Sequence, residues 1–575
     1  MSRVELTLPP DQERAVRVRL ARLDAEGFAA RLERRDESLW SDDPEHRKIA
    51  RNRLGWLGVP ATMRAQTGAF RDFAADVRSE GFERVVLLGM GGSSLAPEVL
   101  RRALGVAPGF LDLEVLDSTS PAAVREVLAR GAPSTTLFLV SSKSGATVEV
   151  SCFERVAFSW VQKARGASAG RSFVAITDAG TPLERLARER VYRRVFLNPP
   201  DIGGRYSALS SFGLVPAALI GADLDALLDS ALAESRESGA PVGAEQNGAL
   251  RLGATLGELA LMGRDKVTLV LGHPFEALGS WIEQLLAEST GKQGLGLVPV
   301  VDEALAPPEA YGEDRVFVVI TSAPTPDVTR RLAALQQAGH PIISWSRHDA
   351  VELGAEFMRW EKATAVAGAV LGIDPFDEPN VAEAKQATRS VLDDFAREGA
   401  LPVVESVAAA GGLTVAAPDD LARSLRTRLS DPADPGSWPA ALTGAGEPGD
   451  YYAILAYFHS TPERLERLAR LRELVRLHTG LATTLGFGPR YLHSTGQLHK
   501  GGGNRGIFLQ LVAEEGDLEI PGEPYGFHTL LWAQGLGDYQ VLARHGRRVL
   551  RLNLGGEIER GLDVLAEAIS AARRP

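Results

Sequence analysis

From about residue 83, short runs rich in β-branched and aliphatic residues alternate with longer stretches of helical character. The runs are RVVLLGMGG, LDLEVLDS, TTLFLVSS, RSFVAITD and RRVFLNPP. This alternation is typical of βαβ units, which build a parallel sheet covered on both faces by helices. Ligands of such sheets bind at the carboxyl ends of the strands. The sequence therefore predicts an α/β protein whose functional residues lie in the loops that follow its strands.

The same alternation recurs twice further along the chain. It returns with KVTLVLG at Lys266 and again with YYAILAYF at Tyr451, after a stretch dense in Pro, Gly and Asp that is typical of a linker. The predicted parts are a helical N-terminal arm (1–80), a first sheet domain (81–212), a helical connector (213–264), a second sheet domain (265–430), the linker (431–450) and a C-terminal α/β segment (451–575). The sequence leaves open whether the last part is a separate domain or a further layer on the second.

Composition limits the classes of function. A chain of 575 residues is too long for one core, and its net charge of -11 argues against a nucleic-acid partner, while a small anionic substrate remains compatible. Cys152 is the only cysteine, which excludes an intrachain disulfide and a thiolate zinc site. Without an apolar run of membrane length or the apolar core of a signal peptide, we expect a cytoplasmic protein with no membrane partner.

The first strand is followed by GMGGSS, which contains Gly92 and Ser93 and precedes a helix expected near Leu95. Glycines let a ligand approach the backbone, and free amides at a helix start bind anions. A dinucleotide fingerprint would need glycine at position 94, where this chain has serine, although Asp117 lies at a suitable distance for a ribose contact. A nicotinamide cofactor and a tight turn without ligand both stay open as alternatives.

A second strand is followed by SSKSGAT, which is crowded with hydroxyl groups. Ser142, Ser144 and Thr147 can each donate to a phosphate oxygen, and Lys143 supplies positive charge. Helix capping would explain one of these hydroxyls but not all of them. Because the two loops follow neighbouring βα units, they are expected to converge on one monophosphate pocket.

The stretch WIEQLLAESTGK, which begins at Trp281, has the apolar spacing of an amphipathic helix. Trp281, Leu285 and Leu286 define its buried side. Gln284 and Glu288 lie four residues apart and so stand one above the other on a single face.

The residues after Glu288 are expected to end this helix. Ser289 and Thr290 begin the stop, and Gly291 suits a left-handed cap. Glu288 then sits in the last turn, where the helix dipole disfavours ionisation and should raise its pKa. A carboxylate poised nearer to neutral pH is a better general base, although a surface glutamate is the simpler alternative.

Four further residues are candidates for chemistry. Arg205 follows two glycines and offers a permanently charged donor for an oxyanion, and Lys385 lies on a helix expected to start at Pro379. Each of these two, taken alone, is more simply a surface residue. His493 and His499 lie six residues apart in a glycine-rich segment, a spacing that suits proton transfer better than a zinc pair.

Together these motifs resemble the phosphoglucose isomerase family, whose two sugar isomerase (SIS) domains interconvert glucose 6-phosphate and fructose 6-phosphate. The matching pieces are GMGGSS, SSKSGAT, GGRYSALS, QLLAESTGK and PFDEPNVAEAK, in the family's order between about residues 83 and 390. The later YLHSTGQLHKGGGNRGIFLQL and the N-terminal part look most like the isomerase half of bifunctional transaldolase/phosphoglucose isomerase proteins, without a transaldolase-sized segment. The resemblance implies two SIS-type parallel-sheet sandwich domains.

The resemblance also implies roles for individual residues. Glu288 would move a proton between C1 and C2 through a cis-enediol, Gln284 would orient the substrate, Arg205 would stabilise the enediolate and Lys385 would assist ring opening. The residues implied to hold the phosphate are Gly92, Ser93, Ser142, Lys143, Ser144 and Thr147.

This chain departs from the family pattern in two places. Glu378 stands where the family usually has glutamine before its proline. The family's ring-opening histidine normally lies between the base and the lysine, whereas the HSTGQLHKGG segment follows both, so we assign the role to His493 or His499. His340 lies in the expected interval but in a strand-like run, and we expect it to be structural.

The implied reaction needs neither a cofactor nor a metal ion. In many family members a partner subunit supplies the ring-opening histidine, and the C-terminal segment of this chain could replace it. A homodimer and a monomer therefore both remain open. The alternatives are a non-catalytic SIS regulator that binds sugar phosphate, an isomerase that also accepts mannose 6-phosphate, and a dehydrogenase.

Overall fold

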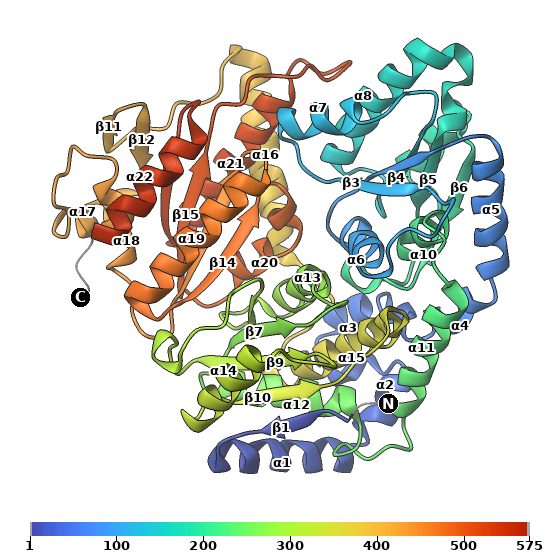
Figure 1. Ribbon diagram of the computed structural model, residues 1–575, viewed down its shortest axis with the longest axis horizontal. Helices are drawn as coiled ribbons and strands as arrows, with labels where there is room; N and C mark the ends of the chain where they lie inside the picture. The colour runs from blue at the N-terminus through green and yellow to red at the C-terminus, as the bar shows by residue number, and fades with distance from the viewer. Residues whose placement is uncertain (1–2, 572–575) are drawn as a thin grey trace.

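The computed structural model describes residues 3–571 and contains three sheets, which confirms the α/β class (Figure 1). The first sheet is wholly parallel and has the order β3-β2-β4-β5-β6. Its strands are β2 (Arg84–Leu88), β3 (Asp112–Leu116), β4 (Thr136–Ser141), β5 (Phe173–Thr177) and β6 (Arg194–Leu197). The crossover helices are α6 (Leu95–Leu104), α7 (Pro121–Ala129), α8 (Val148–Arg165) and α9 (Pro182–Glu189). β4 is buried along its whole length, as expected for a strand covered on both faces.

The second sheet has the order β1-β10-β9-β7-β8. Its parallel strands are β7 (Lys266–Leu271), β8 (Val298–Val300), β9 (Arg315–Ile320) and β10 (Ile342–Trp345). β1 (Glu5–Thr7) pairs antiparallel with β10. The prediction of a helical N-terminal part is therefore wrong for these residues, which form a strand. The helices around this sheet are α11 (Leu224–Glu237), α12 (Gly248–Leu261), α13 (Leu278–Thr290), α14 (Pro326–Gln337) and α15 (Leu353–Leu371).

The N-terminal helices do not form a projecting arm. They are α1 (Pro10–Ala25), α2 (Phe28–Glu33), α3 (Pro44–Arg51), α4 (Val59–Arg64) and α5 (Thr67–Ser79). α1 packs on α12, α4 on α11, and α5 on α10 (Ser211–Leu219), the helix that follows the first sheet. Their apolar residues belong to one core shared with both of the first two sheets, because each helix buries a single apolar stripe.

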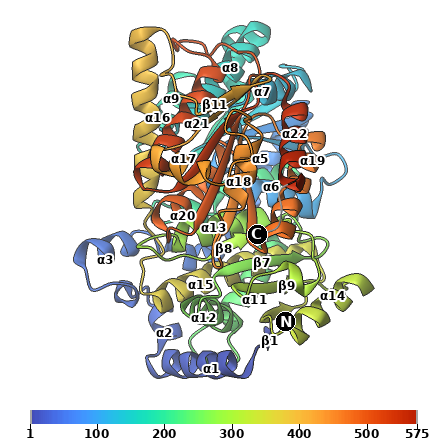
Figure 2. The same cartoon turned by 90° about the vertical axis from the view of Figure 1, so that its left-hand side faces the viewer.

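The third sheet has the order β11-β12-β16-β15-β13-β14. Its strands are β11 (Ala408–Ala410), β12 (Leu413–Ala416), β13 (Tyr451–Tyr457), β14 (Ala482–Phe487), β15 (Gly506–Val512) and β16 (Arg548–Asn553). Its main helices are α16 (Pro379–Glu398), α19 (Pro462–Thr479), α20 (Gly496–Gly501), α21 (Phe527–Arg544) and α22 (Ile558–Ala571). Figure 2 shows α16 running along one side of this part of the molecule.

Two predicted boundaries differ from the structure. β11 and β12 belong to the third sheet, although they fall inside the range 265–430 assigned to the second domain. The range 431–450 assigned to a linker contains α18 (Ser437–Thr443), whose Trp438 is completely buried.

One face of the third sheet has its own core, and the other shares a core with the first sheet.

Helix α13 lies where the three parts meet (Figure 1). It contacts α6 of the first domain, α15 and β8 of the second, and α20 of the third. Among the described helices, none combines the length and hydropathy that a bilayer-spanning segment needs.

Candidate active site

The helix α13 has the buried face that its sequence predicts. Trp281, Leu285 and Leu286 are at most 1% exposed. Gln284 and Glu288 lie together on another face, with the Gln284 Nε2 donating to the Glu288 Oε2 at 3.2 Å. The spacing of four residues therefore places the amide and the carboxylate side by side.

The predicted left-handed cap at Gly291 is wrong. Gly291 has φ −77° and ψ 70°, and the helix continues through Thr290. A side chain at this position would place its Cβ 2.3 Å from the Cα of Leu498 in α20. Glycine is thus needed for the close approach of α20 and not for a positive φ.

The carboxylate of Glu288 is held from two sides. Its Oε1 accepts from the Nη1 of Arg205 at 3.1 Å, while Oε2 faces Gln284. Burial raises the pKa of Glu288 above its ordinary value; Arg205 opposes this shift and the like charge of Glu378 adds to it. The direction of the pKa shift agrees with the prediction from the sequence, but burial is its main cause and not the helix dipole.

Arg205 is buried at the centre of the site and is not a surface residue. Its Nε donates to the Ser289 Oγ at 2.8 Å and its Nη1 to the Glu378 Oε2 at 2.9 Å. Its Nη2 donates to the carbonyl oxygens of Pro375 at 2.8 Å and Asp377 at 3.0 Å. These contacts fix the plane of the guanidinium beside Glu288.

The GMGGSS loop packs directly against these residues. A Cβ on Gly92 would lie 2.0 Å from the carbonyl oxygen of Gly204, the residue before Arg205. A Cβ on Gly91 would lie 2.9 Å from the Nε2 of Gln284 and 2.9 Å from the carbonyl oxygen of His493. Glycine at both positions is therefore required by close contact with the site.

The SSKSGAT loop lies beside GMGGSS, as predicted from neighbouring βα units. The Ser141 Oγ donates to the carbonyl oxygen of Ser93 at 3.1 Å. The hydroxyls of Ser142 and Thr147 are 3.0 Å apart, and the Gly145 amide donates to the Ser142 Oγ at 3.1 Å. Thr147 precedes α8 without capping it through its side chain, so its hydroxyl stays within the loop.

The other two polar residues of this loop are arranged differently. Lys143 forms an ion pair with Asp178, and its Nζ also donates to the carbonyl oxygen of Pro200 at 3.1 Å. Ser144 is exposed, and its Oγ accepts from the Ala146 amide at 3.3 Å. The structure thus brings Ser142 and Thr147 together and leaves Lys143 and Ser144 toward the rim of the loop.

The residue that suggested a ribose contact is occupied within the protein. Asp117 is buried, and its Oδ2 accepts from the Ser94 Oγ at 3.2 Å. The same oxygen lies 3.4 Å from the Nε of Arg490. These interactions weaken the dinucleotide alternative, because the carboxylate has internal partners.

His493 lies at the site. Its carbonyl oxygen accepts from the Gln284 Nε2 at 2.8 Å, and its ring Nε2 is 3.1 Å from the Glu149 Oε1. His493 reaches this place from the third sheet, in the segment between β14 and α20.

His499, the other candidate, lies elsewhere. It is 2% exposed, its Nδ1 is 3.0 Å from the hydroxyl of Tyr451, and its ring stacks on Tyr451 with Phe508 at its edge. Burial lowers its pKa well below the ordinary value. The structure therefore places His499 in a core.

His340 is buried against the rings of Tyr311 and Phe317, as a structural residue would be.

Glu149 is a site residue that the sequence analysis missed. It also accepts from the Gln534 Nε2 at 2.8 Å. Burial opposes its ionisation, but the charge of His493 and its hydrogen bond outweigh burial and hold the pKa of Glu149 below the usual range. The exposed Lys385 on α16 also lowers it through its charge. The sequence feature that could have indicated Glu149 is its position two residues after Thr147, in the first turn of α8.

Lys292 was also missed, although it ends the ESTGK motif. It is buried, and its Nζ donates to the carbonyl oxygens of Asp374 at 2.8 Å and Asp377 at 2.6 Å. It also donates to the Asp377 Oδ1 at 2.5 Å. Lys292 thereby holds the loop whose carbonyl groups bind Arg205.

The third sheet is connected to the site through Gln497 as well. The Nε2 of Gln497 donates to the carbonyl oxygen of Gly291 at 2.9 Å, and its Oε1 accepts from the Asn380 amide at 2.9 Å. One side chain of α20 therefore links the end of α13 to the start of α16.

Comparison with known proteins shows which family the chain is related to. The family model for phosphoglucose isomerase matches residues 60–297. A glucose-6-phosphate isomerase of Rubrobacter xylanophilus is 33% identical over 389 residues, covering 58% of this chain and 88% of the relative. The chain belongs to the phosphoglucose isomerase family. A second glucose-6-phosphate isomerase, from Thermus thermophilus, is 29% identical over 383 residues, covering 59% of this chain and 90% of the relative.

Solved structures show the same fold. A hypothetical protein from Thermus thermophilus matches with a TM-score of 0.55 and 24% identity, over 67% of this chain and 99% of that one. A glucose-6-phosphate isomerase from Chlamydia trachomatis matches with a TM-score of 0.51 and 19% identity, over 64% and 78% of the two chains. The phosphoglucose isomerase model includes the loops, Arg205 and Glu288, but ends before Lys385 and His493.

Proposed function

We propose that this protein is a glucose-6-phosphate isomerase that interconverts glucose 6-phosphate and fructose 6-phosphate, a step of glycolysis and gluconeogenesis, in the cytoplasm. Membership of the phosphoglucose isomerase family supports this proposal. The observation that carries it is the Glu288 carboxylate, whose side chain is only 12% exposed and which is held between Arg205 and Gln284 beside the hydroxyl-rich loops. A sugar-phosphate regulator would need only the loops, because binding without chemistry requires no poised base.

The phosphate is assigned to the first-sheet loops. The hydroxyls of Ser142 and Thr147 face one another, and the uncapped start of α8 adds backbone amides that favour an anion. Gly92 and Ser93 approach from the neighbouring loop. Lys143 and Ser144, at the rim of the SSKSGAT loop, are the remaining residues of the proposed phosphate-binding set.

The reaction begins with ring opening. His493, paired with Glu149, is assigned to transfer the proton that opens the sugar ring, and Lys385 is assigned to assist from α16. His499 is withdrawn from this role because its ring is buried against Tyr451.

The proton transfer between carbons is assigned to Glu288. Its carboxylate removes the proton from C2 of the open-chain aldose; the electrons of that C–H bond form the C1=C2 double bond, and the carbonyl electrons move to O1 to give the enediolate. The proton of the O2 hydroxyl is transferred to O1, and Glu288 then returns its proton to C1 as the carbonyl forms at C2, which gives the ketose. The permanent charge of Arg205 offsets the negative charge of the enediolate, for which one such donor is worth about 3 kcal/mol. Burial raises the pKa of Glu288, which makes it a better base near neutral pH.

The site is proposed to be complete within one chain. His493 comes from the C-terminal segment of the same chain that carries Glu288. A partner subunit is therefore not needed to supply the ring-opening histidine, and a monomer is expected to be active. Activity per chain that falls on dilution as a dimer dissociates would contradict this expectation.

A coupled assay with fructose 6-phosphate, detecting glucose 6-phosphate, tests the proposal. Glu288→Gln should lower turnover by roughly 10²–10⁴-fold, because the general base is lost, while calorimetric binding of the sugar phosphate persists. Glu276→Gln is the matched control, because Glu276 precedes the same helix and is half exposed. Near-normal turnover of Glu288→Gln would show that the base is another residue. The same assay with mannose 6-phosphate determines whether the C2 epimer is accepted.

A further inference from the structure

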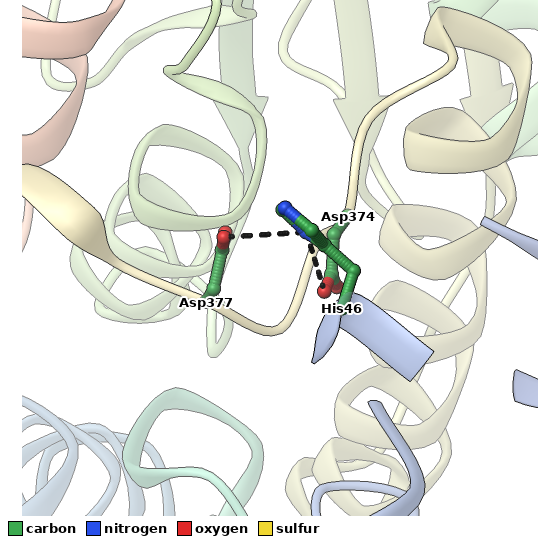
Figure 3. A group of neighbouring side chains, drawn as sticks. All are labelled: His46, Asp374 and Asp377. Atoms are coloured by element: carbon green, nitrogen blue, oxygen red, sulfur yellow. Dashed lines mark ion pairs between the residues drawn. The ribbon is translucent and has the colours of Figure 1, made fainter. Parts of the chain in front are cut away.

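Three potential metal ligands converge at a place that the proposed reaction does not use. His46 lies on α3, and Asp374 and Asp377 lie on the loop between α15 and α16 (Figure 3). The His46 Nδ1 is 3.5 Å from the Asp374 Oδ2 and 3.8 Å from the Asp377 Oδ2. These separations are too long for hydrogen bonds. They suit two atoms bound to one ion at about 2.0–2.2 Å each.

One of these ligand atoms is buried without a partner. Asp374 is 2% exposed, and its Oδ1 accepts from the Phe376 amide at 2.9 Å. Its Oδ2, the atom that faces His46, has no hydrogen-bond partner within residues 3–571. An unsatisfied buried carboxylate oxygen is costly, and a bound cation would satisfy it.

The two carboxylates of the cluster and the neighbouring Lys292 leave one net negative charge for a cation to balance. Lys292 donates to the Oδ1 of Asp377 at 2.5 Å and leaves the Oδ2 directed toward His46. That lysine offsets one of the two carboxylates, while the imidazole, when neutral, adds a nitrogen ligand without charge. The His46 side chain is 35% exposed, so an ion can enter from solvent and keep water in its remaining positions.

We propose that His46, Asp374 and Asp377 bind a divalent transition-metal cation of the class of Zn²⁺, Mn²⁺ or Co²⁺. One imidazole nitrogen and two carboxylate oxygens match the ligand preference of these ions, whereas Mg²⁺ and Ca²⁺ prefer oxygen alone. Water would fill the open positions of the coordination shell.

The site would act on the protein and not on the reacting carbons. It connects α3 of the N-terminal part to the 374–378 loop, whose carbonyl groups at Pro375 and Asp377 accept from Arg205. A bound ion would therefore stabilise the support of Arg205, while no step of the isomerisation passes through it.

Metal binding to the full-length protein tests this inference independently of activity. After dialysis against a chelator, the protein is titrated with Zn²⁺ by calorimetry and with Co²⁺ by visible absorption. We expect one saturable site and a rise in the unfolding temperature with added Zn²⁺, because the ion binds the folded state. His46→Ala should weaken Zn²⁺ binding by more than about 100-fold, beyond the loss usual for outer-shell partners.

His545→Ala is the matched control. His545 pairs with Glu383 at 2.8 Å and is 32% exposed, so it resembles His46 except for the second carboxylate. This variant should keep wild-type affinity. Asp374→Asn should match His46→Ala, and if it fails to fold, the surface variant His46→Ala still decides the question. Equal Zn²⁺ affinity in wild type and His46→Ala, no saturable binding, or a preference for Mg²⁺ would each overturn the proposal.

Discussion

The Nε2 of His493 lies 3.1 Å from the Oε1 of Glu149, although the two residues belong to different sheets and are separated by 344 positions. Glu149 opens α8 in the first domain, and His493 follows β14 in the third sheet. Gln284 of α13 holds the carbonyl oxygen of His493 from a third direction. The proposed ring-opening pair therefore forms only when the C-terminal segment is docked.

Replacing each histidine separates catalysis from stability. His493→Gln should lower kcat/KM for fructose 6-phosphate by about 10²-fold, since a proton-transfer group is lost, while its side-chain amide keeps a donor for Glu149, so the unfolding free energy should change little. His499→Ala should instead destabilise the fold by about 3 kcal/mol, because it empties a buried site between Tyr451 and Phe508. Steady-state kinetics and urea unfolding measure the two effects. A reversed pattern would assign the role to His499.

Removing the charge of Glu378 should move the acid limb of the pH–rate profile. Burial and the nearby Glu378 raise the pKa of Glu288, so activity is lost as pH falls through that raised value. Glu378→Gln removes the like charge and leaves Arg205 more available to Glu288. The acid limb of kcat/KM should therefore shift to lower pH. An unchanged limb, or a shift to higher pH, would contradict this coupling.

The hydroxyls of the SSKSGAT loop should differ in their effect on substrate binding. Ser142→Ala and Thr147→Val each remove a donor to the phosphate, and KM should rise about 10–100-fold, as for the loss of a hydrogen bond to a charged group. Ser144→Ala should have a smaller effect, because Ser144 is exposed at the rim. Initial rates over a range of fructose 6-phosphate concentrations measure KM. Equal effects of all three changes would indicate that Ser144 turns inward when substrate binds.

Glu283 should make stability decline with rising pH. It lines a cavity of about 710 Å³ between the first and third sheets, and burial raises its pKa from 4.5 to about 7. Between these values the folded protein binds more protons than the unfolded chain, so the unfolding free energy falls as pH rises from about 4.5 to 7. For a fully buried group, this difference in pKa would lower the unfolding free energy by roughly 3 kcal/mol. Glu283 is half-buried, so we expect a decline of about 2 kcal/mol.

Glu283→Gln tests this by urea unfolding at pH 5 and pH 8. In Glu283→Gln the unfolding free energy should fall less between pH 5 and pH 8 than in the wild type. In the half-exposed control Glu276→Gln it should fall as in the wild type. Parallel stability curves for wild type and Glu283→Gln would show that Glu283 does not titrate in this range.

Local pattern was enough to predict much of this protein. The alternation of strands and helices predicted the α/β class, and the spacing of Trp281, Leu285 and Leu286 predicted the buried face of α13. The GMGGSS and SSKSGAT loops could be placed side by side because parallel βα units put their loops at one sheet edge. These features depend on residues close in sequence, so periodicity and turn chemistry are sufficient.

Contacts between distant segments were decided only by the tertiary structure. β11 and β12 joined the third sheet because strand pairing depends on which edge is available and not on sequence proximity. Only His493, and not His499, lies at the candidate site, because its segment docks against Gln284 and Glu149. Glu149 could not be predicted from the sequence, because a glutamate in a first helical turn is ordinary. The cluster of His46, Asp374 and Asp377 joins parts of the chain that no local pattern relates. Sequence determined the elements and their loops, and packing determined which side chains face one another.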